Sequence, residues 1–281
     1  MKNILFLTDF SENSWNALTF GLDFFADSEC SFYLLHVSNI NPFKQTSSTS
    51  KPNQETVENV YIKPAKKQLR AVLKRITKEY PHNNNHRFYT LTDYGFFIES
   101  VRKHVFEKNI DLIIMGTQGV SGLKEYILGS NTGNIITKVK CSTLVVPEHA
   151  TYLKPKEIAF PTDFALSNDI RILQPIADIL STKNSNLKIL HIGYKEDQLN
   201  VGQKACKELF DDFFEEFSHS YHFLNSNKQV EDGIQYFIEC NHIDMMIMVA
   251  KNLNYFQQIL FHSKTERISY HTTIPFYVIH E

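Results

Sequence analysis

Three glycines at fixed spacing, placed behind an apolar segment, are the residues of this chain best suited to binding chemistry. Gly116 and Gly119 directly follow the apolar run 110–115, and Gly129 comes after nine further residues. A continuous apolar run predicts a buried parallel strand, and glycines after it let the backbone turn sharply and approach a ligand closely. The spacing therefore predicts a ligand-binding loop at the end of a buried strand.

A helix should begin directly after this loop. Ser130 and Asn131 stand in front of the apolar positions within 135–139, and both residue types are good N-caps. Free N–H groups at a helix start bind anions, so the loop and the helix together predict a phosphate cradle. The segment is not a Walker A loop, because no Gly-Lys-Ser/Thr follows, and its glycine spacing differs from the Rossmann fingerprint.

This glycine spacing resembles that of the nucleotide-binding members of the universal stress protein family. Three further blocks resemble the family in the same order along the chain: residues 2–11 its first strand and acidic turn, residues 34–37 its second strand, and residues 142–147 its closing strand. The resemblance implies an adenine nucleotide as the ligand, ATP or a relative of it, with or without Mg²⁺. It also implies a stress-response regulatory role.

The resemblance further implies a role for each matching residue. Asp9 would lie near the ribose or a phosphate-bound metal, and the backbone of Val37 would pair with adenine. The glycines, with the hydroxyl and N–H groups after them, would surround the ribose and the phosphates. The residues implied in this way are Thr8, Asp9, Val37, Gly116, Gly119, Gly129, Ser130 and Asn131.

Two other classes of function stay open beside nucleotide sensing. One is a ligand-independent interaction protein that keeps the fold and uses its surfaces. The other is a slow ATPase, which needs a positioned water and charge stabilisation at the γ-phosphate. No base and no phosphate-clamping lysine is evident in the glycine loop, where Lys124 is the nearest cation by sequence, so we expect slow hydrolysis or none.

The same layout occurs twice in the chain. Four blocks of the first half are answered by similar blocks in the second: 2–10 by 156–164, 34–37 by 189–192, 109–115 by 242–248, and 142–146 by 275–279. A repeat of this length indicates a duplicated domain, because solenoid repeats run to only about 20–50 residues. We expect two tandem domains, residues 1–148 and 155–281.

The glycine motif is lost from the second half. The register that matches Asp111 to Asp244 places Val249, Asn252 and His262 at the positions of the three glycines, and Ser263 at the position of Ser130. Valine resists the positive φ that glycine permits, and the histidine would project into space that a phosphate needs. We therefore expect a degenerate second domain with a structural or partner-binding role.

Short apolar runs alternate with helical patterns in each half, which predicts an α/β fold of two tandem, open, five-stranded parallel sheets flanked by helices. Strands are predicted near 3–8, 32–37, 87–92, 111–116, 142–146, 157–161, 187–192, 220–225, 244–249 and 275–279. Helices are predicted near 12–27, 56–79, 95–108, 130–139, 168–182, 199–217, 229–240 and 263–270, and a mobile loop over 39–55. The family's strand order, 3-2-1-4-5, would put the binding crevice between the first and fourth strands.

Composition limits the partners. The net charge of -2 argues against nucleic acid as the main partner, because no basic excess is available to displace counterions. The four cysteines form no CxxC pair and have no metal-ligand spacing, and no apolar stretch approaches membrane-spanning length. We expect a cytoplasmic protein whose halves pair through their closing strands, 144–146 against 277–279, with a homodimer through other surfaces left open.

Several residues also have simpler structural interpretations. Asp9 follows a strand, where aspartate is also a routine helix N-cap. His36 and His191, at matched strand ends, favour a structural role, and the other histidines lack partners at zinc-ligand spacing. Four phenylalanines at helical spacing predict a buried helix face: Phe210, Phe213, Phe214 and Phe217.

Overall fold

The fold is taken from a computed structural model of the 281-residue chain. It describes residues 1–39, 53–81, 84–117, 130–165, 170–193, 196–224, 230–250 and 274–280. Residues 40–52 of the loop predicted over 39–55 and the helix predicted over 263–270 lie outside these ranges, whereas Gln54 and Glu55 belong to a helix instead of the loop.

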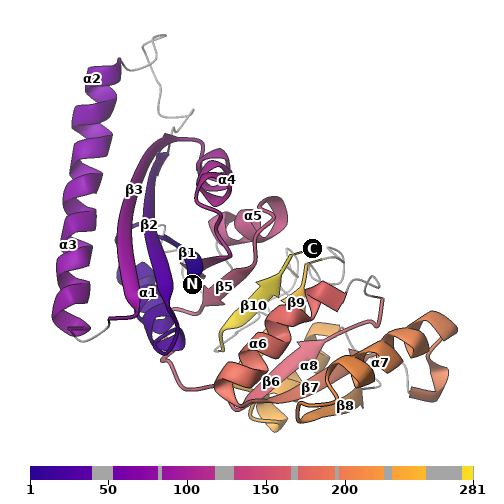
Figure 1. Cartoon of the computed structure of the whole chain (residues 1–281). Helices are drawn as coiled ribbons and strands as arrows, with labels where there is room; N and C mark the ends of the chain where they lie inside the picture. The colour runs from indigo at the N-terminus through magenta and orange to yellow at the C-terminus, as the bar shows by residue number, and fades with distance from the viewer. Residues whose placement is uncertain are drawn as a thin grey trace.

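The first half alternates strands and helices from its first residues (Figure 1). Its strands are β1 (Lys2–Leu7), β2 (Cys30–Asn39), β3 (His86–Gly95), β4 (Leu112–Gly116) and β5 (Thr143–Val146). Its helices are α1 (Glu12–Phe24), α2 (Gln54–Val57), a π-helical turn (Glu58–Ile62), α3 (Lys63–Glu79), α4 (Phe97–Glu107) and α5 (Ser130–Lys138).

The second half repeats this alternation. Its strands are β6 (Glu157–Pro161), β7 (Asn186–Ile192), β8 (His219–Leu224), β9 (Met245–Val249) and β10 (Phe276–Ile279). Its described helices are α6 (Gln174–Lys183), α7 (Val201–Phe213) and α8 (Val230–Cys240), with 3-10 turns at Ile170–Ile172 and Glu196–Gln198.

The strands of both halves form one sheet in the order β3-β2-β1-β4-β5-β10-β9-β6-β7-β8. Each half contributes five parallel strands in the expected order 3-2-1-4-5. The predicted pairing of the closing strands is confirmed: β5 and β10 run antiparallel, with Leu144 opposite Tyr277 and Val145 opposite Phe276. The two predicted five-stranded sheets are therefore continuous, because each covers the edge that the other would expose.

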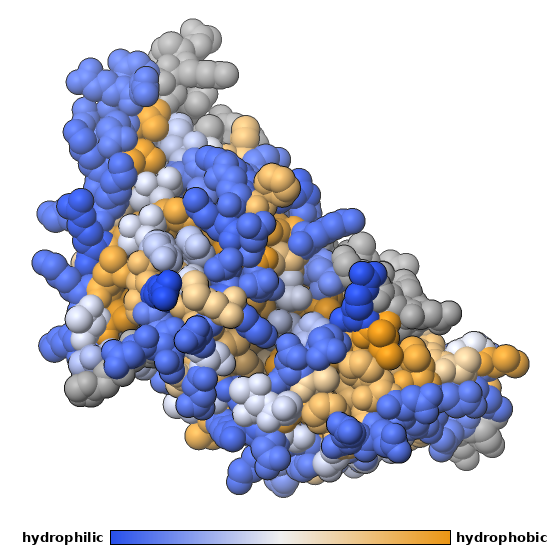
Figure 2. All heavy atoms as spheres, viewed as in Figure 1, coloured by the Kyte–Doolittle hydropathy of each residue, from blue (hydrophilic) through white to orange (hydrophobic). Residues whose placement is uncertain are grey.

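Alternation along the strands divides the core into two layers. Ile4 and Phe6 of β1 pack into the layer beneath α1, α3, α6 and α7, whereas Leu5 and Leu7 pack beneath α4, α5 and α8. Helix α3 buries one apolar stripe and turns a hydrophilic face outward, at the left of Figure 2. Of the helices within the described ranges, none is both long and apolar enough to cross a membrane.

The predicted helix ends shift where proline is present. The helix predicted over 56–79 is divided into α2, a π-helical turn and α3, and Pro64 lies in the first turn of α3. Proline lacks the N–H that an α-helical interior needs but is tolerated in a first turn. The helix predicted over 168–182 begins only at Gln174 for the same reason, because Pro175 follows directly.

Candidate functional site

The candidate site lies where the strand order of the first half reverses. Strands β1 and β4 are neighbours, with Phe6 in register with Ile114, and both end at the same edge of the sheet. From β1 the chain continues outward through β2 and β3, whereas β4 leads to β5 on the other side. Crevices of open parallel sheets form at the carboxyl ends of the strands at such a point.

The turn after β1 is held by its own side chains. Thr8 is buried, and its hydroxyl accepts from the Phe10 N–H at 3.0 Å and lies 3.0 Å from the Ser14 hydroxyl. Asp9 Oδ1 accepts from the N–H and the hydroxyl of Ser11, at 3.0 and 2.5 Å. Ser11, not Asp9, is the N-cap of α1, because its hydroxyl oxygen accepts from the Ser14 N–H at 3.1 Å. The carboxylate therefore fixes the turn from one side of the crevice.

The second half contains the same turn. Thr162 accepts from the Phe164 N–H at 3.0 Å, and Phe164 has φ +56° where Phe10 has φ +67°. His191 Nδ1 lies 2.9 Å from the carbonyl oxygen of Thr162, as His36 Nδ1 does from that of Thr8. A half that has lost the glycine motif keeps these contacts, so they stabilise the turn itself. The predicted structural role of both histidines is confirmed.

Val37 presents its backbone to the crevice. The Thr8 N–H donates to the carbonyl oxygen of Leu35 at 3.0 Å, so the backbone polar groups of Leu35 point toward β1. Groups two residues apart on a strand point the same way. Val37 therefore turns its N–H and C=O toward β1, beyond the point where β1 ends at Leu7.

Gly116 ends β4 and faces the first turn of α1. A Cβ added to Gly116 would lie 2.7 Å from Asn13 Oδ1 and 3.0 Å from Asn13 Cγ. Asn13 is itself buried, with 8% of its surface exposed. A side chain at this position would therefore displace the Asn13 amide, whether or not a ligand binds there.

Thr132 connects the two ends of the glycine loop. This buried residue of α5 donates its hydroxyl to the Gly116 carbonyl oxygen at 3.0 Å. Sequence reasoning missed it, because threonine inside a helix gives no signal that its partner lies on the preceding strand. Ser130 and Asn131 are exposed in the first turn of α5, beside this connection.

The remaining predicted ligand residues belong to the loop between β4 and α5. Gly119 and Gly129, together with Lys124, lie outside the described residues. Within the described ranges no group of three or more His, Cys, Asp or Glu side chains is arranged to hold a metal ion. The structure therefore brings together Thr8, Asp9, the backbone of Val37, Gly116 and the start of α5 around one strand-order reversal.

The corresponding edge of the second half differs in its contacts. Gln203, in the first turn of α7, donates its amide to the carbonyl oxygen of Asp163 at 2.9 Å. Asp163 Oδ1 accepts from the Ala165 N–H at 3.0 Å. Strand β9 ends at Val249, where the first half has Gly116. A neighbouring helix thus contacts the turn that in the first half borders the crevice.

Comparison with known proteins supplies independent information. The model of the Universal stress protein family matches residues 1–147. A universal stress protein of Methanocaldococcus jannaschii is 30% identical over 155 residues, covering 52% of this chain and 94% of that protein. A second one from the same organism is 25% identical over 145 residues, covering 52% of this chain and 81% of that protein.

A solved structure extends the likeness to the whole chain. A universal stress protein from Archaeoglobus fulgidus aligns with 99% of this chain and 98% of its own, with a TM-score of 0.72 and 17% sequence identity. At that identity the likeness is one of fold. It covers both halves, including the second half that the family model does not match.

Proposed function

This chain belongs to the universal stress protein family, and from that premise we propose that its first half binds an adenine nucleotide, ATP or a close relative, as a regulatory module. Asp9 follows β1, Val37 lies near the end of β2, and Gly116 ends β4, so the three strand ends would border the bound nucleotide. The loop that carries Gly119 and Gly129 leads from β4 to α5, where Ser130 and Asn131 begin the helix. One observation carries the proposal: two distant motifs, the acidic turn and the glycine loop, meet at the strand-order reversal.

The donor groups suit such a ligand. An adenine edge needs one donor and one acceptor from the protein, and the N–H and C=O of Val37 face the crevice beyond the end of β1. Phosphates suit the start of α5, where backbone N–H groups and the helix dipole favour negative charge. Where Mg²⁺ accompanies the phosphates, Asp9 supplies a carboxylate on the opposite side of the crevice.

We propose a different role for the second half. It keeps the Thr-Asp-Phe turn but has Val249, Asn252 and His262 in place of the glycines. It covers the open edge of the first half through the β5–β10 pair. Its proposed role is therefore that of an internal partner that holds the nucleotide-binding half in a paired arrangement.

Calorimetric titration of the full chain with ATP tests the proposal. Gly119→Val should abolish binding, because a β-branched side chain resists positive φ and would crowd the phosphates of a bound nucleotide. Asn252→Val is the matched control, since it places valine at the corresponding position of the second half and should leave ATP affinity unchanged. Unchanged ATP affinity in a folded Gly119→Val protein would show that the glycine loop is not the site.

A further inference from the structure

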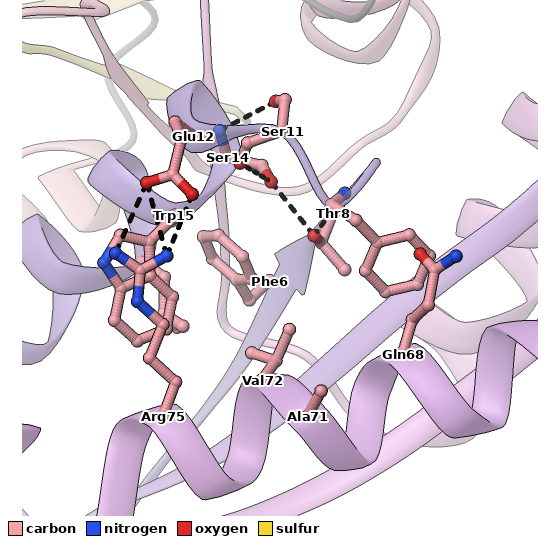
Figure 3. Close-up of a pocket in the computed structure, with 12 residues that line it drawn as sticks. Phe6, Thr8, Ser11, Glu12, Ser14, Trp15, Gln68, Ala71, Val72 and Arg75 are labelled. Carbon is pink, nitrogen blue, oxygen red and sulfur yellow. Dashed lines mark hydrogen bonds and ion pairs between the residues drawn. The ribbon is translucent and has the colours of Figure 1, made fainter. Parts of the chain in front are cut away.

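A second hollow lies on the other layer of the first half, between α1 and α3 (Figure 3). Its volume is about 250 Å³. Phe6 and Leu18, which form its floor, belong to the core layer beneath α1 and α3. Val37 and Met115 of the proposed nucleotide site belong to the opposite layer, whereas Thr8 borders both that site and the hollow.

The walls of the hollow are mainly apolar. The rings of Phe10 and Trp15 and the side chain of Val72 line it, and all three are partly exposed. The hydroxyls of Thr8 and Ser14 also reach it, but they lie 3.0 Å from each other, and Ser14 donates to the Ser11 carbonyl oxygen at 2.8 Å. These hydroxyls are therefore already satisfied, and the interior favours an apolar occupant.

Charge at the rim is balanced. The Arg75 guanidinium lies 3.9 Å above the Trp15 ring, and its Nη1 and Nη2 donate to the Glu12 carboxylate at 3.0–3.3 Å. Glu79 accepts from Arg75 Nε at 3.0 Å. With four hydrogen bonds to two carboxylates, Arg75 presents no unmatched positive charge to an anion. Gln68 supplies the remaining polar group, an amide at the opposite end of the hollow in Figure 3.

The duplicated half shows how an aromatic ring fills part of the same place. Helix α7 connects the second and third strands of its half, as α3 does in the first. The two helices end with the same contact: the Tyr80 N–H donates to the carbonyl oxygen of Ile76, and the Phe214 N–H donates to that of Phe210. Phe210 therefore corresponds to Ile76, next to Arg75, which lines the hollow.

Phe210 packs onto the turn and strand that correspond to the floor of the hollow. The ring of Phe210 is fully buried, with its centroid 5.7 Å from that of Phe160 and 5.9 Å from that of Phe164. Phe164 is 2% exposed, whereas its counterpart Phe10 is partly exposed and lines the hollow. The Phe210 ring therefore occupies in one repeat part of a volume that stays open in the other.

We propose that this hollow is a second ligand site, one that takes a neutral, planar aromatic molecule of about two fused rings with one polar edge. An apolar cavity of about 150 Å³ accommodates benzene, so a volume of about 250 Å³ suits two rings. The ligand stacks among Phe10, Trp15 and Val72, as aromatic rings do in the second half. Its polar edge meets the Gln68 amide, which offers both a donor and an acceptor.

Trp15 makes the proposal directly measurable, because it is the one tryptophan of the chain. Protein labelled with 5-fluorotryptophan gives a single fluorine NMR signal from this wall of the hollow. Titration with indole should shift that signal saturably. Indole-3-acetate, which has the same rings and a carboxylate, should bind at least tenfold more weakly, because the rim has no unmatched positive charge.

Ala71→Phe tests the location. The substitution adds a phenyl ring to α3 at an exposed position that lines the hollow, so the core stays unchanged. Because the ring occupies the space of the ligand, indole affinity should fall at least tenfold. Lys74→Phe is the matched control: it adds the same ring to the same helix at an exposed position that does not line the hollow, and it should leave the affinity unchanged. Equal indole affinity in Ala71→Phe and wild type, or no saturable shift in wild type, overturns the proposal.

Gln68→Leu gives a second test that does not depend on filling the hollow. It should weaken indole binding roughly three- to tenfold, the effect of one lost hydrogen bond, and leave binding of naphthalene unchanged. Equal loss for both molecules would refute the role given to the amide. ATP titration of the same variants separates the two sites, because each of these changes lies on the layer away from Val37.

Discussion

Replacing Gly116 by alanine should destabilise the first half, although it adds a single methyl group. The added Cβ would lie 2.7 Å from Asn13 Oδ1, 3.0 Å from Cγ and 3.1 Å from Nδ2. Because all three atoms are too close, rotation of the amide cannot relieve the contact. Asn13 is buried in the first turn of α1, so the side chain or the helix end must move. Overpacking of this kind costs about 1–3 kcal/mol.

A double-mutant cycle isolates this contact. Urea denaturation, followed by circular dichroism and by Trp15 fluorescence, would compare Gly116→Ala in the wild-type and Asn13→Ala backgrounds. The cost should fall by at least about half once Asn13 is truncated, because residues in contact are energetically coupled. Gly202→Ala is the control: its nearest atom would lie 3.4 Å away, and in a helix it should be neutral or stabilising by up to about 1 kcal/mol. A neutral Gly116→Ala, or an equal cost in both backgrounds, refutes the reasoning.

Three further expectations concern the junction of the halves and the buried histidines. Lys183 is buried, donates to the carbonyl oxygen of Phe24 and lies 4.4 Å from the centroid of the Phe24 ring. Because Lys183→Met leaves that carbonyl without its partner, it should lower the free energy of unfolding measured in urea titrations by about 1–3 kcal/mol. Burial lowers the pKa of His86 and His104 from 6.5, so the unfolded chain binds protons at these histidines more readily than the folded chain does. The free energy of unfolding should therefore fall as pH drops below 6.5. Denaturation measured between about pH 7.5 and pH 5 should show a smaller fall in His104→Gln than in the wild type. Residues 1–148 expressed alone leave the β5 edge uncovered and should self-associate in light scattering, whereas a monomer at every concentration would contradict that expectation.

Most of the fold could be predicted from the sequence because the strands are buried on both faces. Such strands appear as short apolar runs, and the same runs recur in the same order in the second half. The β5–β10 pairing could be predicted from the need to cover two edges. The helix starts at Gln174 and Lys63 were harder to predict, because the helical pattern continues on both sides of the proline and does not show where the proline divides it.

The contacts of the site could be predicted only in part. The sequence places Asp9 and Gly116 at strand ends, and the strand order brings those ends together. It does not reveal that Gly116 faces Asn13, or that Thr132 bonds back to β4, because both contacts join residues far apart in the chain. The hollow beneath α3 could not be predicted for the same reason: its lining residues come from β1, α1 and α3, which lie far apart in the chain.

Nucleotide occupancy is the central claim, and mass spectrometry of small molecules released from freshly purified full-length protein tests it most directly. The account predicts an adenine nucleotide in the extract of the wild-type protein, retained in Asn252→Val and absent from a folded Gly119→Val protein. Extracts free of adenine nucleotide, from wild-type protein that also fails to bind added ATP, would contradict it.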